Sequence, residues 1–219
     1  YVAWNQPQMP WDGSLLQLAH LKHDADGVPM LDRVETLAGD TQTSLFQPEF
    51  SPDGRTLAYA SDKTGWWQLY LYDLASGTHT QLTDADAEDA APAWAQGART
   101  FAWSHDGAAI YFIRNQAGRS SLWRCEVGNH KLRRVTALDH YGYLWQIAAS
   151  PLRGEVALLA SANTIPDRVI TYEIEHGIVA TIPQPSETPT INVIVDDDRD
   201  EEWVRKRSGS EMLMGHYAD

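Results

Sequence analysis

Residues 47–73 read QPEFSPDGRTLAYASDKTGWWQLYLYD, and this stretch decides the fold. A turn at its Asp-Gly pair separates two apolar segments, and a second turn leads into an alternating aromatic segment. Glycine readily adopts the positive φ that tight hairpin turns need, so the pattern predicts consecutive antiparallel strands. The expected strands end near residue 50 and then cover residues 56–61, 67–74 and 79–82.

The same pattern recurs along the chain. SPDG at residues 51–54 reappears as SHDG at residues 104–107, and more loosely as SPLRG at residues 150–154. Four antiparallel strands in roughly 40 to 50 residues are typical of one blade of a β-propeller. The later part of the unit keeps the same register: LYLYD at 69–73 aligns with LQLAH at 16–20, LWRCE at 122–126 and VITYE at 169–173.

The repeat predicts an all-β, incomplete β-propeller with about three and a half four-stranded blades of a seven-bladed closed form. The first blade lacks the equivalent of the SPDG turn. Residues 184–219 are expected to hold an exit strand near residues 191–195, an acidic linker and a short helix over residues 210–215, with Ser208 or Ser210 as its N-cap. The blades are expected at residues 1–43, 44–87, 88–138 and 139–183.

Composition narrows the possible partners and compartments. The formal net charge of −13 repels nucleic acid and anionic lipid surfaces, so we expect neither as a partner. Cys125 is the single cysteine, which excludes an internal disulfide and fits a reducing compartment. No apolar run approaches the length of about 18 residues that a membrane span needs. We therefore expect a cytoplasmic protein without a membrane partner.

Two stretches carry a resemblance to a known family. AWNQPQMPWDGSLLQL at residues 3–18 and the stretch from residue 46 to residue 73 resemble the N-terminal propeller of the prolyl oligopeptidase family. The acylaminoacyl-peptidase and dipeptidyl-peptidase-like branch is the most similar. Phe50, Lys63 and Gln68 depart mildly from the family pattern, which usually has Trp, Arg and Asn there.

The resemblance implies a function. In that family the propeller caps an α/β-hydrolase domain with a Ser-Asp-His triad and restricts access, so that oligopeptides reach the serine. This chain contains no Gly-x-Ser-x-Gly motif, which that class of hydrolase needs for its nucleophile, so we assign no catalytic residue. We expect the hydrolase domain to follow residue 219. The alternative is a stand-alone propeller that binds proteins or glycans.

Three residues are candidates for substrate contact. Glu88 precedes an innermost strand and could pair with the free amino terminus of a peptide, although a solvated loop acid beside Asp84, Asp86 and Asp89 is the simpler interpretation. Trp66 could line a site, but alternation favours packing between blades for at least one of Trp66 and Trp67. Trp11 lies in a long connection, where it either binds a ligand or plugs the blade ends.

Metal and cofactor sites are not expected. His20 and His23 lack a third ligand at a recognised spacing, and a hairpin turn explains the acidic residues around Asp26 better than a calcium loop does. Because sheet faces would lack neighbours in an incomplete propeller, we also expect the chain to associate with itself or with another chain.

Overall fold

The structure is a computed structural model that describes residues 1–95, 97–182, 190–196, 201–208 and 210–216. Strands dominate these residues, and the one helix among them is the 3-10 turn η1 (Thr136–Leu138). The chain divides into two compact units, residues 1–182 and residues 183–219. Each unit is described by itself.

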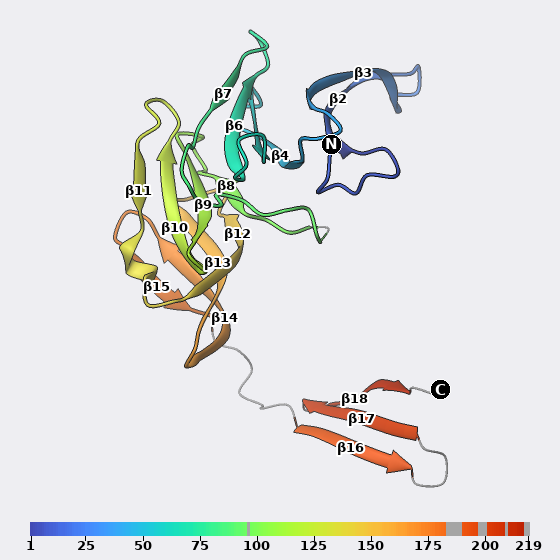
Figure 1. The fold of residues 1–219 in the computed structure, drawn as a ribbon, viewed down its shortest axis with the longest axis vertical. Helices are drawn as coiled ribbons and strands as arrows, with labels where there is room; N and C mark the ends of the chain where they lie inside the picture. The colour runs from blue at the N-terminus through green and yellow to red at the C-terminus, as the bar shows by residue number, and fades with distance from the viewer. Residues whose placement is uncertain (96, 183–189, 197–200, 209, 217–219) are drawn as a thin grey trace. The chain divides into compact units, whose positions relative to one another are not determined.

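Four antiparallel sheets follow one another along residues 1–182 (Figure 1). In every sheet, strands that are consecutive in sequence are hydrogen-bonded neighbours. This arrangement confirms the all-β, incomplete β-propeller. The first sheet contains β1 (Val2–Ala3), β2 (Leu15–His23) and β3 (Pro29–Gly39); the second contains β4 (Leu45–Phe50), β5 (Thr56–Ser61), β6 (Gln68–Asp73) and β7 (His79–Gln81); the third contains β8 (Phe101–Trp103), β9 (Ala109–Gln116), β10 (Arg119–Glu126) and β11 (Leu132–Arg134); the fourth contains β12 (Tyr143–Ala149), β13 (Glu155–Ala162), β14 (Ile165–Glu173) and β15 (Ile178–Thr181).

The repeated SPDG turn has a specific hydrogen-bond structure. Ser51 Oγ donates to Asp53 Oδ1 (2.6 Å) and accepts from the Thr56 amide (3.0 Å), while Gly54 has a φ of 70°. The turn at residues 104–107 repeats these bonds between the equivalent residues. Because the serine hydroxyl holds the aspartate and the following strand at once, this tetrapeptide joins the first two strands of a blade.

Apolar side chains between successive sheets form the core. Alternation gives each strand two faces, and the faces of neighbouring sheets bury each other in three separate clusters. Leu16 packs with Leu45 and Leu57 between the first two sheets. Leu69 packs with Phe101 and Phe112 between the second and third, and Ile110 belongs to the same cluster. The third and fourth sheets bury a cluster that includes Tyr111, Leu122, Leu144, Ile147, Leu158 and Ile170.

The second unit forms a sheet of its own. β16 (Thr190–Asp196), β17 (Glu201–Ser208) and β18 (Ser210–His216) pair antiparallel in sequence order. The exit strand expected over residues 191–195 lies within β16. The helix expected over residues 210–215 is wrong, because the backbone of β18 pairs with β17 in a tight hairpin and this pairing overrides the weak helical signal. Residues 197–200 of the acidic run lie outside the described residues.

Candidate ligand-binding site

The first strands of three consecutive sheets are joined by glutamine side chains. Gln47, in β4, accepts hydrogen bonds from the amide (2.6 Å) and hydroxyl (3.1 Å) of Thr100 and donates to the carbonyl of Phe101 (2.7 Å). Gln146, in β12, accepts a bond from the amide of Arg99 (2.8 Å). The two glutamines therefore hold the residues that lead into β8 from both neighbouring sheets.

Both glutamines stand at irregular points of their strands. The φ is 49° at Gln47 and 54° at Gln146, and the pairing register shifts beside each of them. A bulge of this kind re-aims a side chain, here toward the neighbouring sheet. Sequence reasoning missed this feature. The signal was present, because Gln47, Thr100 and Gln146 each precede the serine of their repeat by four residues.

Two cavities lie on either side of the segment that precedes β8. The first cavity, of about 560 Å³, is bounded by the connection around Trp11 and by β4. The second cavity, of about 550 Å³, is bounded by β9 and β12. Trp94 and Arg99 line both. Both volumes fall in the range of small-molecule sites, about 300–1,000 Å³.

Glu88 lines the second cavity. Its backbone forms a two-bond bridge with Asn115, and its carboxylate Oε2 accepts the Trp67 amide proton at 2.8 Å. Oε1 accepts no hydrogen bond from the described residues, so it is free to meet a ligand. The half-buried Glu88 is thus a fixed acceptor at the wall of the cavity rather than a mobile loop acid.

Asp89, the acidic neighbour of Glu88 in the loop, is not solvated. Asp89 is fully buried and forms a bidentate pair with Arg114, at 2.5 Å to Nε and 2.8 Å to Nη2. The guanidinium of Arg114 also lies 4.3 Å from the centroid of the Trp123 ring. A buried carboxylate needs a partner of this kind, which the sequence did not reveal because the two residues are 25 positions apart.

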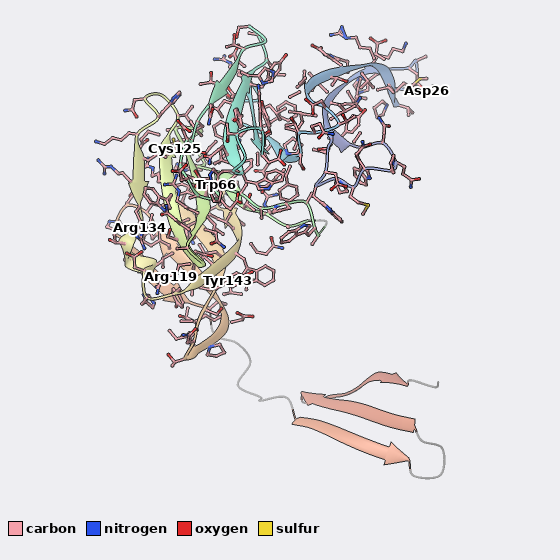
Figure 2. The ribbon with its side chains drawn as sticks, in the orientation of Figure 1. Asp26, Trp66, Arg119, Cys125, Arg134 and Tyr143 are labelled. Atoms are coloured by element: carbon pink, nitrogen blue, oxygen red, sulfur yellow. The ribbon has the colours of Figure 1, made fainter. Side chains whose placement is uncertain are left out.

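The two tryptophan candidates lie in different surroundings. Trp11 is about one-third exposed and lines the first cavity together with Trp4 and Trp94. Trp66, labelled in Figure 2, directly precedes Trp67 and β6, is 42% exposed and lines neither cavity. Its neighbour Trp67 is buried in the cluster between the second and third sheets, as alternation predicted for one of the pair.

A charged pair stands between the two cavities. Arg99 forms an ion pair with Glu49, whose side chain is mostly buried. Burial raises the pKa of Glu49, and this outweighs the lowering by the Gln47 hydrogen bond and by the Arg99 charge. The arrangement places a guanidinium with spare N–H donors at the boundary of both cavities.

Other sequence features have structural explanations. Asp24 accepts the amide protons of Asp26 and Val28 (both 2.9 Å), so this acidic segment is the turn of the β2–β3 hairpin, at whose tip Figure 2 shows Asp26. His20 contacts Glu35 and Arg33 on the surface. Among the described residues no cluster of three or more His, Cys, Asp or Glu could hold a metal ion. No helix in that part of the chain could cross a membrane.

Known proteins share this architecture. The chain is 22% identical to dipeptidyl-peptidase 5 of Porphyromonas gingivalis over 173 residues, covering 76% of this chain and 23% of that protein. A crystal structure of puromycin hydrolase is 26% identical and superposes with a TM-score of 0.71, covering 94% of this chain and 31% of the hydrolase. A puromycin-hydrolyzing peptidase of Mycobacterium tuberculosis shares the fold at 23% identity, with a TM-score of 0.69.

The chain therefore spans less than a third of the length of these peptidases. The relatives confirm the resemblance to the N-terminal propeller of the prolyl oligopeptidase family. The family model described as the TolB beta propeller domain, PD40, matches residues 28–189. Since this match covers most of the chain and the sheets have propeller order, the chain belongs to the PD40 family of TolB-like β-propeller domains.

Proposed function

We propose that the chain is the non-catalytic, substrate-gating propeller portion of a serine peptidase of the prolyl oligopeptidase family that hydrolyses oligopeptides. The observation that supports this proposal is the similarity to dipeptidyl-peptidase 5 and puromycin hydrolase, of which this chain matches 23% and 31% of the length. The parent protein would supply the α/β-hydrolase domain and its Ser-Asp-His triad. In this role the propeller admits extended peptides and keeps folded proteins away from the serine.

Glu88 is the residue of this chain best placed to touch the substrate. Its backbone is fixed by Asn115 and one carboxylate oxygen is held by Trp67, while the other oxygen is free at the cavity wall. A rigid carboxylate beside apolar surface forms a strong charge-assisted bond with an ammonium group. We therefore assign Glu88 to the free amino terminus of the peptide.

The test is a peptidase assay of the full-length parent protein with one oligopeptide in free-amine and N-acylated forms. We expect hydrolysis of the peptide, and a kcat/KM for the free amine that falls about tenfold in the variant Glu88→Gln, as the loss of a charged hydrogen bond implies. The acylated peptide should be unaffected, and Glu126→Gln on the third sheet serves as the matched control.

The two parts of the proposal fail in different ways. A parent protein that hydrolyses no peptide, or whose reading frame beyond residue 219 encodes no Gly-x-Ser-x-Gly motif, contradicts the peptidase assignment. It would favour the alternative, a stand-alone propeller that binds proteins or glycans. Equal loss for both peptide forms in Glu88→Gln contradicts only the role of Glu88.

We further propose that the isolated chain self-associates. The first sheet carries exposed apolar side chains on β2 and β3, among them Leu21, Met30, Leu31 and Val34. Sheet faces of this kind favour association with another chain. Sedimentation should show dimers or larger species that dissociate on dilution, and a stable dilute monomer that binds no hydrophobic dye would contradict this.

A cytoplasmic location is also part of the proposal. Cys125 is buried, and burial raises the pKa of its thiol to about 11, so the cysteine is a packing residue with no need for an oxidising compartment. Fractionation of the native cells tests this. Recovery of the parent protein outside the cytoplasmic fraction would contradict it.

A further inference from the structure

A third cavity, of about 280 Å³, lies between the first and second sheets. It is formed by the end of β3, the connection to β4, and residues of β5, β6 and β7. It shares only Leu45 with the first cavity and none of its residues with the second. Its size is near the lower limit for small-molecule sites.

Tyr70 brings an unused hydroxyl to this cavity. The side chain is 7% exposed, and its hydroxyl oxygen is buried without a hydrogen-bond partner among the described residues. The hydroxyl of Thr64, which donates to the Trp66 carbonyl at 3.3 Å, is close enough to lower the pKa of Tyr70 but lies beyond hydrogen-bond distance of the Tyr70 oxygen. Burial raises the pKa of Tyr70, so the hydroxyl keeps its proton and can donate it. An unpaired buried hydroxyl is costly, which favours a bound acceptor.

Two further donors line the same cavity. Lys63 lines the cavity and forms no ion pair with any carboxylate in the described part of the chain. Ser61 Oγ accepts the Lys63 amide proton at 3.3 Å, which leaves the proton of the serine hydroxyl available. Three donors therefore meet without protein acceptors.

The acceptors at the cavity are already engaged. Asp40, at the exposed rim, accepts the Gln42 amide proton at 2.7 Å, and this bond is the largest cause that lowers the pKa of Asp40. The Nδ1 atom of His79 shares a hydrogen bond of 2.9 Å with the hydroxyl of Tyr59. Burial lowers the pKa of His79, so its ring is neutral at pH 7. The charge of Lys63 also lowers the pKa of Asp40, so a bound anion would compete with Asp40 for this lysine.

We propose that this cavity binds a small organic carboxylate. The carboxylate oxygens would accept from Tyr70, Lys63 and Ser61, and the hydrocarbon part would pack on Leu37 and Leu45 and on the stacked rings of Tyr59 and Tyr70, whose centroids are 5.5 Å apart. The negative charge of Asp40 opposes any anion but lies at the rim. The site is independent of the proposed peptidase function, because it lies between two sheets and away from Glu88.

The test uses butyrate as the probe and the whole 219-residue chain. Amide chemical shifts of Gly39 and Lys63 should change along a saturable curve as butyrate is added. The affinity should fall about tenfold in Lys63→Met and several-fold in Tyr70→Phe, which keeps the ring and its packing. Lys131→Met, on the β10–β11 turn, is the matched control and should bind as the original chain does. The uncharged isostere n-butanol should bind much more weakly.

Two results would overturn the proposal. The first is an absence of saturable shifts with butyrate, which would mean that the cavity holds only water. The second is an equal response to n-butanol, or an unchanged affinity in both Lys63→Met and Tyr70→Phe, which would mean that only the apolar wall contacts the probe.

Discussion

The interface between the second and third sheets differs from the interface between the third and fourth. The former adds buried polar contacts to its apolar cluster: the Asp89–Arg114 pair, the bonds of Gln47 to Thr100 and Phe101, and the bond from Trp103 Nε1 to the Glu49 carbonyl (3.2 Å). The latter relies mainly on apolar packing around Tyr111 and Leu158, with Gln146 contributing from its edge.

Apolar packing and polar contacts therefore stabilise different parts of this fold. Apolar alternation stacks one sheet on the next, because it buries area without specifying a precise register. Polar contacts fix the long connection of residues 84–100, which lines both large cavities and whose described residues pair with a strand only at Glu88. The polar interface is therefore the one that shapes the candidate site.

The largest effect is expected from Asp89→Ala. The substitution leaves the guanidinium of Arg114 buried without its partner, which should lower the free energy of unfolding by about 3–5 kcal/mol. Urea unfolding followed by tryptophan fluorescence measures this. The control is Asp32→Ala, which removes the exposed pair with Lys22 and should cost less than about 1 kcal/mol. Similar losses in both variants would mean that the buried Asp89–Arg114 pair stabilises the fold no more than an exposed pair does.

A second substitution tests the apolar interface between the third and fourth sheets. Leu158→Ala opens a cavity between the third and fourth sheets and should lower the free energy of unfolding by about 2–5 kcal/mol. The matched control is Leu152→Ala in a turn of the fourth sheet, where the side chain is 86% exposed and the change should be small. The same urea titration applies, and a negligible loss in Leu158→Ala would mean that the cluster does not hold the sheets together.

Much of this architecture was predictable from the sequence, and some of it was not. The strands of the second sheet followed from the Asp-Gly turn and alternation, because both signals are local. The pairing of Asp89 with Arg114 depends on residues brought together across sheets, which no local pattern encodes, whereas the role of Gln47 left a signal only in its spacing from the serine of the repeat. Glu88 was predicted as a contact residue because strand-entry loops can line the channel of a propeller, and this role stays a prediction; its bond to Trp67 was not foreseen.

Gln47 and Gln146 should differ in how much they contribute to the free energy of unfolding. Gln47→Ala leaves the Thr100 amide and the Phe101 carbonyl without their partner and should cost about 2 kcal/mol, whereas Gln146→Ala removes a more exposed contact and should cost about 1 kcal/mol or less. Thermal unfolding of both variants compares them directly. A greater loss for Gln146→Ala would reverse the assignment of the polar interface.

The smallest expected effect is a pH dependence of the free energy of unfolding that comes from Glu49. Since the folded-state pKa of Glu49 is raised above its ordinary 4.5, the folded protein holds this proton more tightly than the unfolded chain does. The contribution of Glu49 to stability is therefore full below pH 4.5 and is lost as the pH rises through the raised pKa. The difference in free energy of unfolding between the original chain and Glu49→Gln should fall over this window. A difference that is flat or rises with pH would contradict the burial of this carboxylate.

A size-selectivity assay on the full-length parent protein would measure whether the propeller restricts access to the serine. One cleavable sequence is presented in a short oligopeptide and within an exposed loop of a stable folded protein, and the initial rates of cleavage are compared. We expect rapid cleavage of the oligopeptide and none of the folded protein. Cleavage of both at similar rates would show that the propeller does not restrict access.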